Sequence, residues 1–332
     1  MRAGDQADEL GRRLRRLVTP RTATTCLSVS TVTAVPLVTA PAPSPCPPAA
    51  APIWLWCAGR PVPTAALDRA LGVDGLALAT ALELVRVDGA LARPTVRLAP
   101  VGGGLVVCDL AGAAAADRVP WPDDSTLHLA GCLPAGRLGR WLDVGTGPAA
   151  LPLAIGPRAD RRRATDVSPH ALALARRGLA LAGADDVELE VADLLAGAGA
   201  GWALVTFNAP IPAEHPGGGA AGTWHRAAPG AEVLPRFWRA VAEVVGPGGE
   251  VLVHGAVAAD GSLGPPRRGA VTVARYTPLD QPGFAVTRWR PDHPAGWRAG
   301  DVVLTAARPY LTRADLDAIE ADGEPAPAGD MG

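Results

Sequence analysis

Two residue types are nearly absent from this chain of 332 residues, which contains no lysine and a single asparagine, Asn208. Arginine, alanine, glycine and proline are abundant instead, a bias expected of a GC-rich coding sequence. Because that bias disfavours asparagine, its one occurrence indicates that the chemistry at position 208 needs an amide side chain. The simpler interpretation is an asparagine in a turn at the end of a strand.

The chain also lacks an excess of charge of one sign, because 31 basic residues stand against 33 acidic ones, a net charge of −2. Such a balance creates no global field for nucleic acid, and we do not expect nucleic acid as a partner. No apolar run is long enough to span a bilayer, so no membrane partner is expected. The six histidines are too scattered for a metal site, and we expect none. The five cysteines lack a C-x-x-C spacing, which favours free thiols and a cytoplasmic location.

Composition predicts five segments along the chain. Residues 4–18 place leucines on one side of a short helix, whereas residues 19–52 are rich in Thr, Ser, Val, Ala and Pro. We interpret the second segment as a flexible linker, since its Ser, Thr and Pro content argues against a secretion signal. The predicted limits are an N-terminal helix (1–18), a low-complexity linker (19–52), an N-terminal lobe (53–118), a larger domain (119–312) and a C-terminal tail (313–332).

The pattern of the N-terminal lobe predicts three helices followed by a β-hairpin. The helices are expected at 53–58, 63–71 and 74–86, and the strands at 95–98 and 105–110. This order is typical of a winged helix, but the third helix is too apolar and uncharged to enter a DNA groove. We therefore expect a substrate or dimerisation lobe, with a homodimer as one expected assembly.

The strongest functional motif is the glycine turn Asp143-Val144-Gly145-Thr146-Gly147. It follows a predicted buried strand, residues 140–144, and precedes a helix of small residues. Gly145 and Gly147 permit a positive φ and the close approach of a ligand to backbone N–H groups. Taken alone, the motif also fits an ordinary connection between a strand and a helix.

Three further predicted strands each end in a polar residue. Asp166 follows the glycine turn by roughly 20 residues, a spacing typical of an acid that accepts ribose hydroxyls. Asp193 and Asn208 end the two strands after that. Because parallel strands bring their carboxyl ends to one edge of a sheet, we expect these side chains along one ligand crevice. Between the strands, Ser168 as N-cap and a glycine stop predict a helix over 169–182.

In their order along the chain, these motifs resemble those of class I S-adenosylmethionine (SAM) methyltransferases. They are most similar to the branch with the motif N-P-P-[YF], which includes release-factor glutamine methyltransferases and amino-group methyltransferases of nucleic-acid bases. The resemblance covers residues 119–255, approximately. It rests on the segments Val119-Pro120-Trp121-Pro122-Asp123-Asp124-Ser125, Asp143-Val144-Gly145-Thr146-Gly147, Thr165-Asp166-Val167-Ser168-Pro169, Ala192-Asp193 and Phe207-Asn208-Ala209-Pro210-Ile211.

The resemblance implies an α/β fold, with a Rossmann-like seven-stranded sheet and a smaller N-terminal α+β domain that is winged-helix-like. Asn208 and Pro210 are the implied catalytic residues. The implied cofactor is SAM, held by Asp143, Gly145, Thr146, Gly147, Asp166, Val167, Asp193, Leu194 and Asn208. Substrate contacts are expected from Asp123, Asp124, Ser125, Ile211, Trp224 and His225, the last two on a long loop after the Asn208 strand.

Two departures from N-P-P-[YF] change the expected acceptor. In the family, the asparagine oxygen and the next backbone carbonyl accept hydrogen bonds from a planar NH2, on which the aromatic residue stacks. Here Ala209 and Ile211 replace the first proline and the aromatic residue, and Ile211 cannot stack in that way. The site is therefore expected to hold a less planar nucleophile or to have lost its activity.

Periodicity predicts the rest of the larger domain. Residues 231–245 are expected to form an amphipathic helix that a glycine-rich turn ends, followed by a fifth strand at 251–254. Further strands are expected at 271–275, 284–289 and 302–307, and an antiparallel pair among them would complete the sheet.

The sequence thus predicts an enzyme that transfers the SAM methyl group to a small molecule or peptide, with nitrogen as the expected atom, in specialised metabolism. One alternative, which Asn208 favours, is methylation of a protein glutamine or of a nucleic-acid base. Another is a SAM-binding or partner-binding module without catalysis, which would use the apolar N-terminal lobe to bind a partner.

Overall fold

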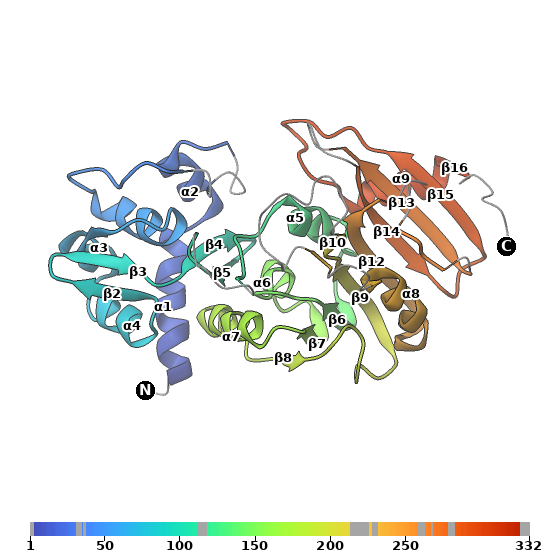
Figure 1. Cartoon of the computed structure of the whole chain (residues 1–332), viewed down its shortest axis with the longest axis horizontal. Coiled ribbons are helices and arrows are strands. Elements are labelled where there is room, and N and C mark those ends of the chain that lie inside the picture. Colours follow the sequence, from blue (N-terminus) through green and yellow to red (C-terminus); the bar gives the residue numbers. More distant parts are fainter. Residues whose placement is uncertain are drawn as a thin grey trace. The chain divides into compact units, whose positions relative to one another are not determined.

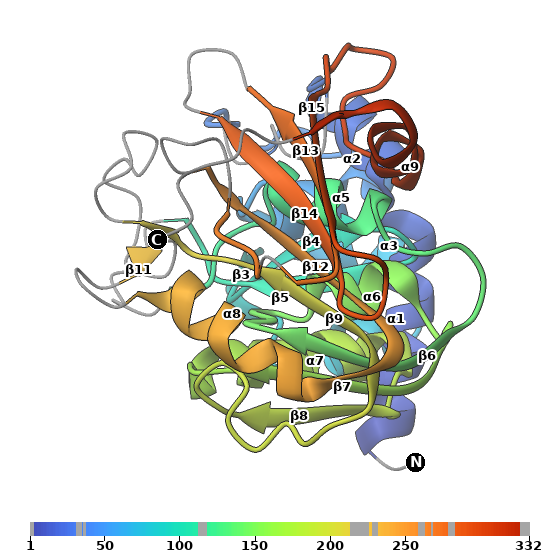
Figure 2. The ribbon, with the colours of Figure 1, turned by 90° about the vertical axis from the view of Figure 1, so that its right-hand side faces the viewer.

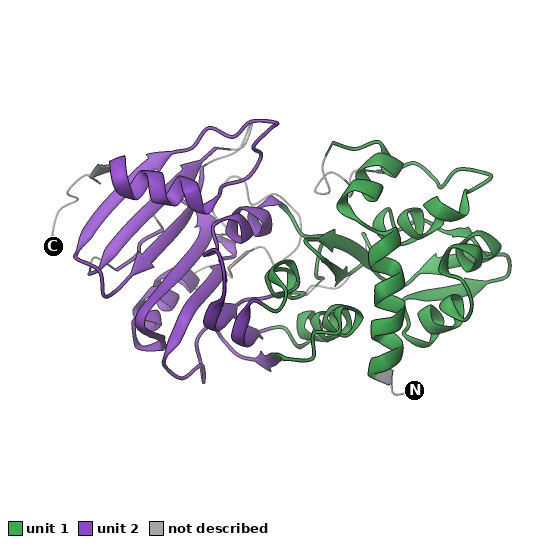
Figure 3. Ribbon diagram, turned by 180° about the vertical axis from the view of Figure 1, so that it is seen from behind, with its two compact units in different colours: residues 1–123, 147–157, 168–187 green, residues 124–146, 158–167, 188–332 purple. Residues whose placement is uncertain are grey.

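The computed structural model describes residues 3–30, 35, 38–111, 118–212, 226–227, 232–257, 263–266, 268–277 and 283–325. Its internal contacts define two compact units (Figure 3). Unit 1 comprises residues 1–123, 147–157 and 168–187, and unit 2 comprises residues 124–146, 158–167 and 188–332. The domain limits inferred from composition stay a prediction. Among the described residues, no helix combines the length and the apolar character needed to cross a bilayer.

Unit 1 combines short helices with two small sheets. Strands β1, β3 and β2 form an antiparallel sheet, and β4 pairs with β5 as the predicted hairpin. Its elements are α1 (Ala3–Leu17), α2 (Pro20–Leu27), η2 (Pro48–Ala50), η3 (Ile53–Cys57), β1 (Val62–Pro63), α3 (Thr64–Leu71), α4 (Gly75–Ala81), β2 (Val85–Asp88), β3 (Leu91–Pro94), β4 (Arg97–Val101), β5 (Gly104–Cys108), α6 (Ala150–Ile155) and α7 (Pro169–Ala182).

Local end signals explain two of these helices, α7 and α2. Ser168 caps α7 by accepting a hydrogen bond from the Ala171 backbone N–H, and Gly183 ends the helix with a positive φ, as predicted. Within the predicted linker, reciprocal bonds between Thr19 and Thr22 begin α2. The prediction of a helix over 74–86 is wrong for the second half of this range. After α4 the chain forms β2, whose backbone groups pair with β3.

Unit 2 is built on one large sheet. Its strands lie in the order β16-β15-β13-β14-β12-β9-β6-β7-β8 (Figure 1). Its elements are α5 (Asp124–Gly131), β6 (Leu138–Val144), β7 (Ala159–Asp166), β8 (Val187–Val191), β9 (Trp202–Asn208), β10 (Ile211–Pro212), β11 (Arg226–Ala227), α8 (Val233–Val244), β12 (Val245–Ala256), β13 (Ala270–Tyr276), β14 (Phe284–Arg290), β15 (Gly296–Asp301), α9 (Arg313–Asp322) and β16 (Glu324–Pro325).

The topology of this sheet confirms the predicted α/β class. Strands β7, β6, β9 and β12 pair in parallel, whereas β14 runs antiparallel to both β12 and β13. The sheet has nine strands rather than the predicted seven, because β15 and β16 extend the edge beyond β13. The prediction of a strand at 302–307 is wrong. The polar segment β15 pairs with β13 instead, and Val303, inside the predicted strand, is 78% exposed.

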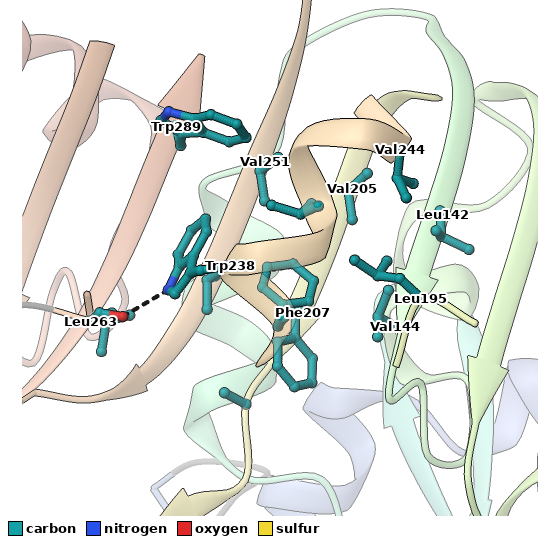
Figure 4. Packing of buried hydrophobic residues seen from close by; sticks show 14 of the residues in the cluster. Leu142, Val144, Leu195, Val205, Phe207, Trp238, Val244, Val251, Leu263 and Trp289 are labelled. Carbon is teal, nitrogen blue, oxygen red and sulfur yellow. Dashed lines mark hydrogen bonds between the residues drawn. The ribbon is translucent and has the colours of Figure 1, made fainter. Parts of the chain in front are cut away.

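Successive side chains of β9 point to opposite faces of the sheet. Val205 and Phe207 pack into the hydrophobic core of unit 2 together with Phe237 and Trp238 of α8 (Figure 4). Figure 2 shows α8 lying against this face. Each fully buried aromatic side chain such as Phe237 contributes about 2–3 kcal/mol of stability. Thr206 and Asn208 of the same strand point to the opposite face, where both side chains form hydrogen bonds.

Candidate functional site

The carboxyl ends of the central strands form the edge where a ligand site is expected. Numbered by chain order, β8, β7, β6, β9 and β12 lie in the spatial order 3-2-1-4-5, so the winding reverses between β6 and β9. In an open α/β sheet, ligands bind outside the strand carboxyl ends at such a switch point. Asp143, Asp166 and Asn208 lie at the ends of β6, β7 and β9, and Asp193 follows β8. The fold therefore brings the four predicted polar residues to one edge.

The glycine turn after β6 has the backbone conformation that its sequence predicts. Gly145 and Gly147 have φ angles of 61° and 55°. A Cβ at Gly145 would lie 3.2 Å from Cε2 of Phe207, whereas one at Gly147 would meet nothing within 4 Å. The Thr146 backbone N–H donates to the Thr165 carbonyl at 2.8 Å, which joins the turn to the end of β7. A side chain at position 147 would thus extend into open space, and the positive φ is what favours glycine there.

Asp143 is the buried centre of a hydroxyl network. Its two carboxylate oxygens accept hydrogen bonds from Thr146 and Thr206, each at 2.6 Å, and the Trp141 indole N–H donates to the Thr206 hydroxyl at 2.9 Å. Burial raises the pKa of Asp143 to about 6, an effect that the two hydroxyl donors oppose. In the described contacts this carboxylate holds the glycine turn against β9, and its predicted role toward a cofactor stays a prediction.

The neighbouring strand ends combine carboxylates with apolar surface. The Ala192 backbone N–H donates to the Asp166 carbonyl at 3.0 Å, which ties the ends of β7 and β8 together. Val167, directly after Asp166, is 69% exposed although its side chain is apolar. Asp193 forms an ion pair with Arg236 of α8, and Leu194 has a positive φ and packs against the hydrophobic core.

The amide of Asn208 is held by side chains from two other elements. Its Nδ2 donates to the Ser125 hydroxyl of α5 at 2.7 Å, and its Oδ1 lies 2.9 Å from Nδ1 of His254 on β12. Nε2 of His254 in turn lies 2.8 Å from the hydroxyl of Tyr276 on β13. The structure thus joins the predicted residues Ser125 and Asn208, and adds His254 and Tyr276, which the sequence analysis did not single out.

A second histidine, His128 of α5, packs beside this array. Its Nδ1 accepts the Leu311 backbone N–H at 2.9 Å, and its ring centroid lies 4.0 Å from that of Tyr276. Burial lowers the pKa of His128 to about 4, and burial together with the neighbouring His128 lowers the pKa of His254 to about 3. Both rings are therefore neutral near pH 7. The Asp124 carboxylate lies 3.9 Å from Nε2 of His128, and Asp123 precedes α5.

The segment after Asn208 continues along the same edge. The Ala209 backbone N–H donates to the His254 carbonyl at 2.8 Å, and Ile211, after Pro210, pairs with Arg226 in a short parallel ladder. Trp224 and His225, the predicted loop residues, lie outside the described residues.

Fold and edge residues together define a Rossmann-like α/β protein with a candidate ligand site at the switch point of its sheet. No family model and no curated protein matches the chain. Solved structures match it in fold at low similarity. A ribosomal protein L11 methylase from Lactobacillus delbrueckii subsp. bulgaricus is 18% identical, with 50% of this chain and 77% of that chain covered and a TM-score of 0.36.

Two further matches have similar values. A SAM-dependent methyltransferase from Agrobacterium tumefaciens is 15% identical over 63% of this chain and 77% of that chain, with a TM-score of 0.40. TrmK of M. capricolum, in complex with S-adenosyl-homocysteine, is 9% identical over 56% of this chain and 74% of that chain, with a TM-score of 0.37. Similarity at this level does not assign an activity, so function has to be argued from the residues of this chain.

Proposed function

We propose that this chain binds SAM at the carboxyl ends of β6, β7 and β8 and transfers the methyl group to a nitrogen atom of a small-molecule or peptide acceptor beside Asn208. The observation that carries the proposal is the spatial order of one edge of the sheet. A glycine turn, two carboxylates and a fixed amide follow four neighbouring strands, β6, β7, β8 and β9.

The residues at this edge fit the three parts of SAM. The positive φ angles of Gly145 and Gly147 suit the methionine portion, and the buried Asp143 carboxylate would serve as the anion for its ammonium group. Asp166 would accept the two ribose hydroxyls, and the exposed Val167 offers an apolar surface to the adenine ring. Asp193 would approach the adenine amino group.

Alignment is the main task left to the protein. SAM supplies a methyl group on a sulfonium that is already a leaving group, so the residues need to hold the nucleophile in line with it. Asn208 suits this role because its amide is held at both ends. Its Oδ1 has two lone pairs, and only one is used by His254, so the other is available to an acceptor N–H. Ile211, an aliphatic residue after Pro210, supports an acceptor that is not a flat ring.

Calorimetric titration with S-adenosylhomocysteine tests the cofactor. Saturable binding is expected for the wild type, and Asp166→Ala should weaken it about 100-fold, since two hydrogen bonds to a carboxylate are lost. Asp160→Ala is the matched control, because Asp160 lies on the same strand but pairs with Arg137 on the surface. A folded wild-type protein that does not bind the compound would overturn the proposal.

Transfer of tritium from methyl-labelled SAM tests the acceptor. Label is expected in the small-molecule and peptide fractions of a cell extract, and label in protein or nucleic acid would favour the alternative acceptors. Asn208→Ala should keep the affinity for S-adenosylhomocysteine and lose transfer. Equal transfer by this variant would exclude the assigned role of Asn208.

A further inference from the structure

Four side chains from four elements form a continuous line of hydrogen bonds behind the proposed acceptor site. The line runs from Tyr276 through His254 and Asn208 to Ser125, with separations of 2.8, 2.9 and 2.7 Å. Its central pair is set by the sheet, because His254 and Asn208 are directly paired in the parallel register of β12 and β9. Side chains paired in this way lie side by side on the same face.

The donor and acceptor chemistry gives this line one direction. Oδ1 of Asn208 can only accept, so Nδ1 of His254 must carry the proton between them. A neutral imidazole has one N–H, which leaves Nε2 as an acceptor for the Tyr276 hydroxyl. At the other end, Nδ2 of Asn208 donates to Ser125. Protons therefore point from Tyr276 toward Ser125 at every step.

The surroundings keep the imidazole in this state. His254 is 3% exposed, and its ring stacks on Phe284 with a centroid separation of 5.8 Å and an interplanar angle of 9°. The nearby His128 ring is almost parallel to it, at 6.2 Å. Burial also holds the pKa of His254 near 3, so the ring does not gain a second proton near neutral pH.

We infer that His254 is a positioning residue, which Tyr276 holds in the Nδ1–H tautomer and which thereby fixes the direction of the Asn208 amide. This role rests on the proposed methyl transfer at Asn208. With the amide fixed, Oδ1 keeps one lone pair for the N–H of an acceptor. An amide turned by half a rotation would present its NH2 instead, and two donors would then face each other.

The composition of the chain makes the test unusually direct. Asn208 is the only asparagine, so a full-length sample labelled with 15N in asparagine alone shows one side-chain NH2 pair in its NMR spectrum. A second sample, labelled with 15N in histidine, reports the protonation of both ring nitrogens of His254 through long-range couplings. We expect the Nδ1–H tautomer for His254, identified by the signals that disappear in His254→Phe.

Tyr276→Phe removes the hydroxyl that donates to Nε2 of His254, and should move the Nε2 signal of His254 and the side-chain signals of Asn208. Tyr310→Phe is the matched control, because Tyr310 is the only other tyrosine and its ring lies against the His128 ring. It should leave the Asn208 signals in place.

An Nε2–H tautomer in the wild type would overturn the inference, because the protons would then point from Ser125 toward Tyr276. Asn208 signals that move in neither His254→Phe nor Tyr276→Phe would overturn it as well. The wild-type spectrum needs no variant to fold. Titration with S-adenosylhomocysteine on the same samples separates the two ideas: the tautomer decides the positioning role, whereas loss of binding by the wild type counts against the proposed function alone.

Discussion

Acidification should destabilise this protein through its two buried histidines. Burial lowers the pKa values of His128 and His254 from 6.5 to about 4 and about 3. Below pH 6.5 the unfolded chain therefore binds more protons than the folded one, and the free energy of unfolding falls as the pH falls from about 6.5 toward about 3. At pH 5 each histidine costs about 2 kcal/mol relative to pH 7.5.

Asp143 acts in the opposite direction. Burial raises its pKa from 3.8 to about 6, so the folded protein takes up this proton before the unfolded chain does. Between pH 7.5 and pH 5 this uptake returns about 1.4 kcal/mol of stability. The two histidines together cost about 4 kcal/mol, so the net expected loss is about 2–3 kcal/mol.

Urea denaturation at both pH values measures this loss, and a variant isolates its source. His254→Phe keeps a ring in the same position but removes one titrating group. Its loss between pH 7.5 and pH 5 should be smaller than that of the wild type by about 2 kcal/mol. Tyr310→Phe, a ring substitution beside His128, should show the full wild-type loss. Equal losses in wild type and His254→Phe would refute the reasoning.

Three further substitutions test contacts described above, all by urea denaturation. Arg288→Leu removes a buried guanidinium that pairs with Asp317 and Glu320, and should cost about 2–3 kcal/mol because those carboxylates are partly exposed; an unchanged midpoint would show that the pairs contribute nothing. Thr206→Val should cost about 2 kcal/mol by leaving a buried carboxylate and an indole N–H without their hydroxyl. Gly145→Ala should cost about 1–2 kcal/mol through its positive φ and should also weaken binding of S-adenosylhomocysteine; full stability would contradict the turn geometry.

Features fixed by short-range signals were predictable from the sequence. Helix α7 begins at its serine cap and ends at its glycine as predicted, because each signal acts on residues within one turn. The strands β13 and β14 follow from their apolar residues. Strand β15 could not be predicted in this way, because backbone pairing with β13 and β16 holds it and its polar sequence carries no apolar pattern. Helix α9, inside the predicted tail, depends on Leu316 and Ile319, which are buried only in the folded sheet.

In the candidate site, too, residues within sequence motifs were predictable, whereas residues placed by the pairing of strands were not. The order of the motifs predicts Ser125 and Asn208 as site residues, and the structure joins them by a hydrogen bond across 83 positions of the chain. His254 lies in the predicted strand at 251–254, but no motif surrounds it. Its distance along the chain from Asn208 and Tyr276 gives no indication of lateral contact, which depends on strand order and register. One available signal was its place at the end of the strand next to that of Asn208.

The irregular start of β12 has a consequence for how this protein tolerates changes in length. Between Val245 and Glu250 the chain advances five positions while β9 advances two, and from Glu250 to His254 the pairing is regular. Insertions or deletions among the glycines of this irregular segment should leave the regular pairing of β12 with β9, from Glu250 to His254, unchanged. A single residue added between Glu250 and His254 would put Val253 opposite Asn208 and exchange the two faces of the strand. Natural or engineered variants should therefore differ in length before Glu250 and keep a constant spacing after it.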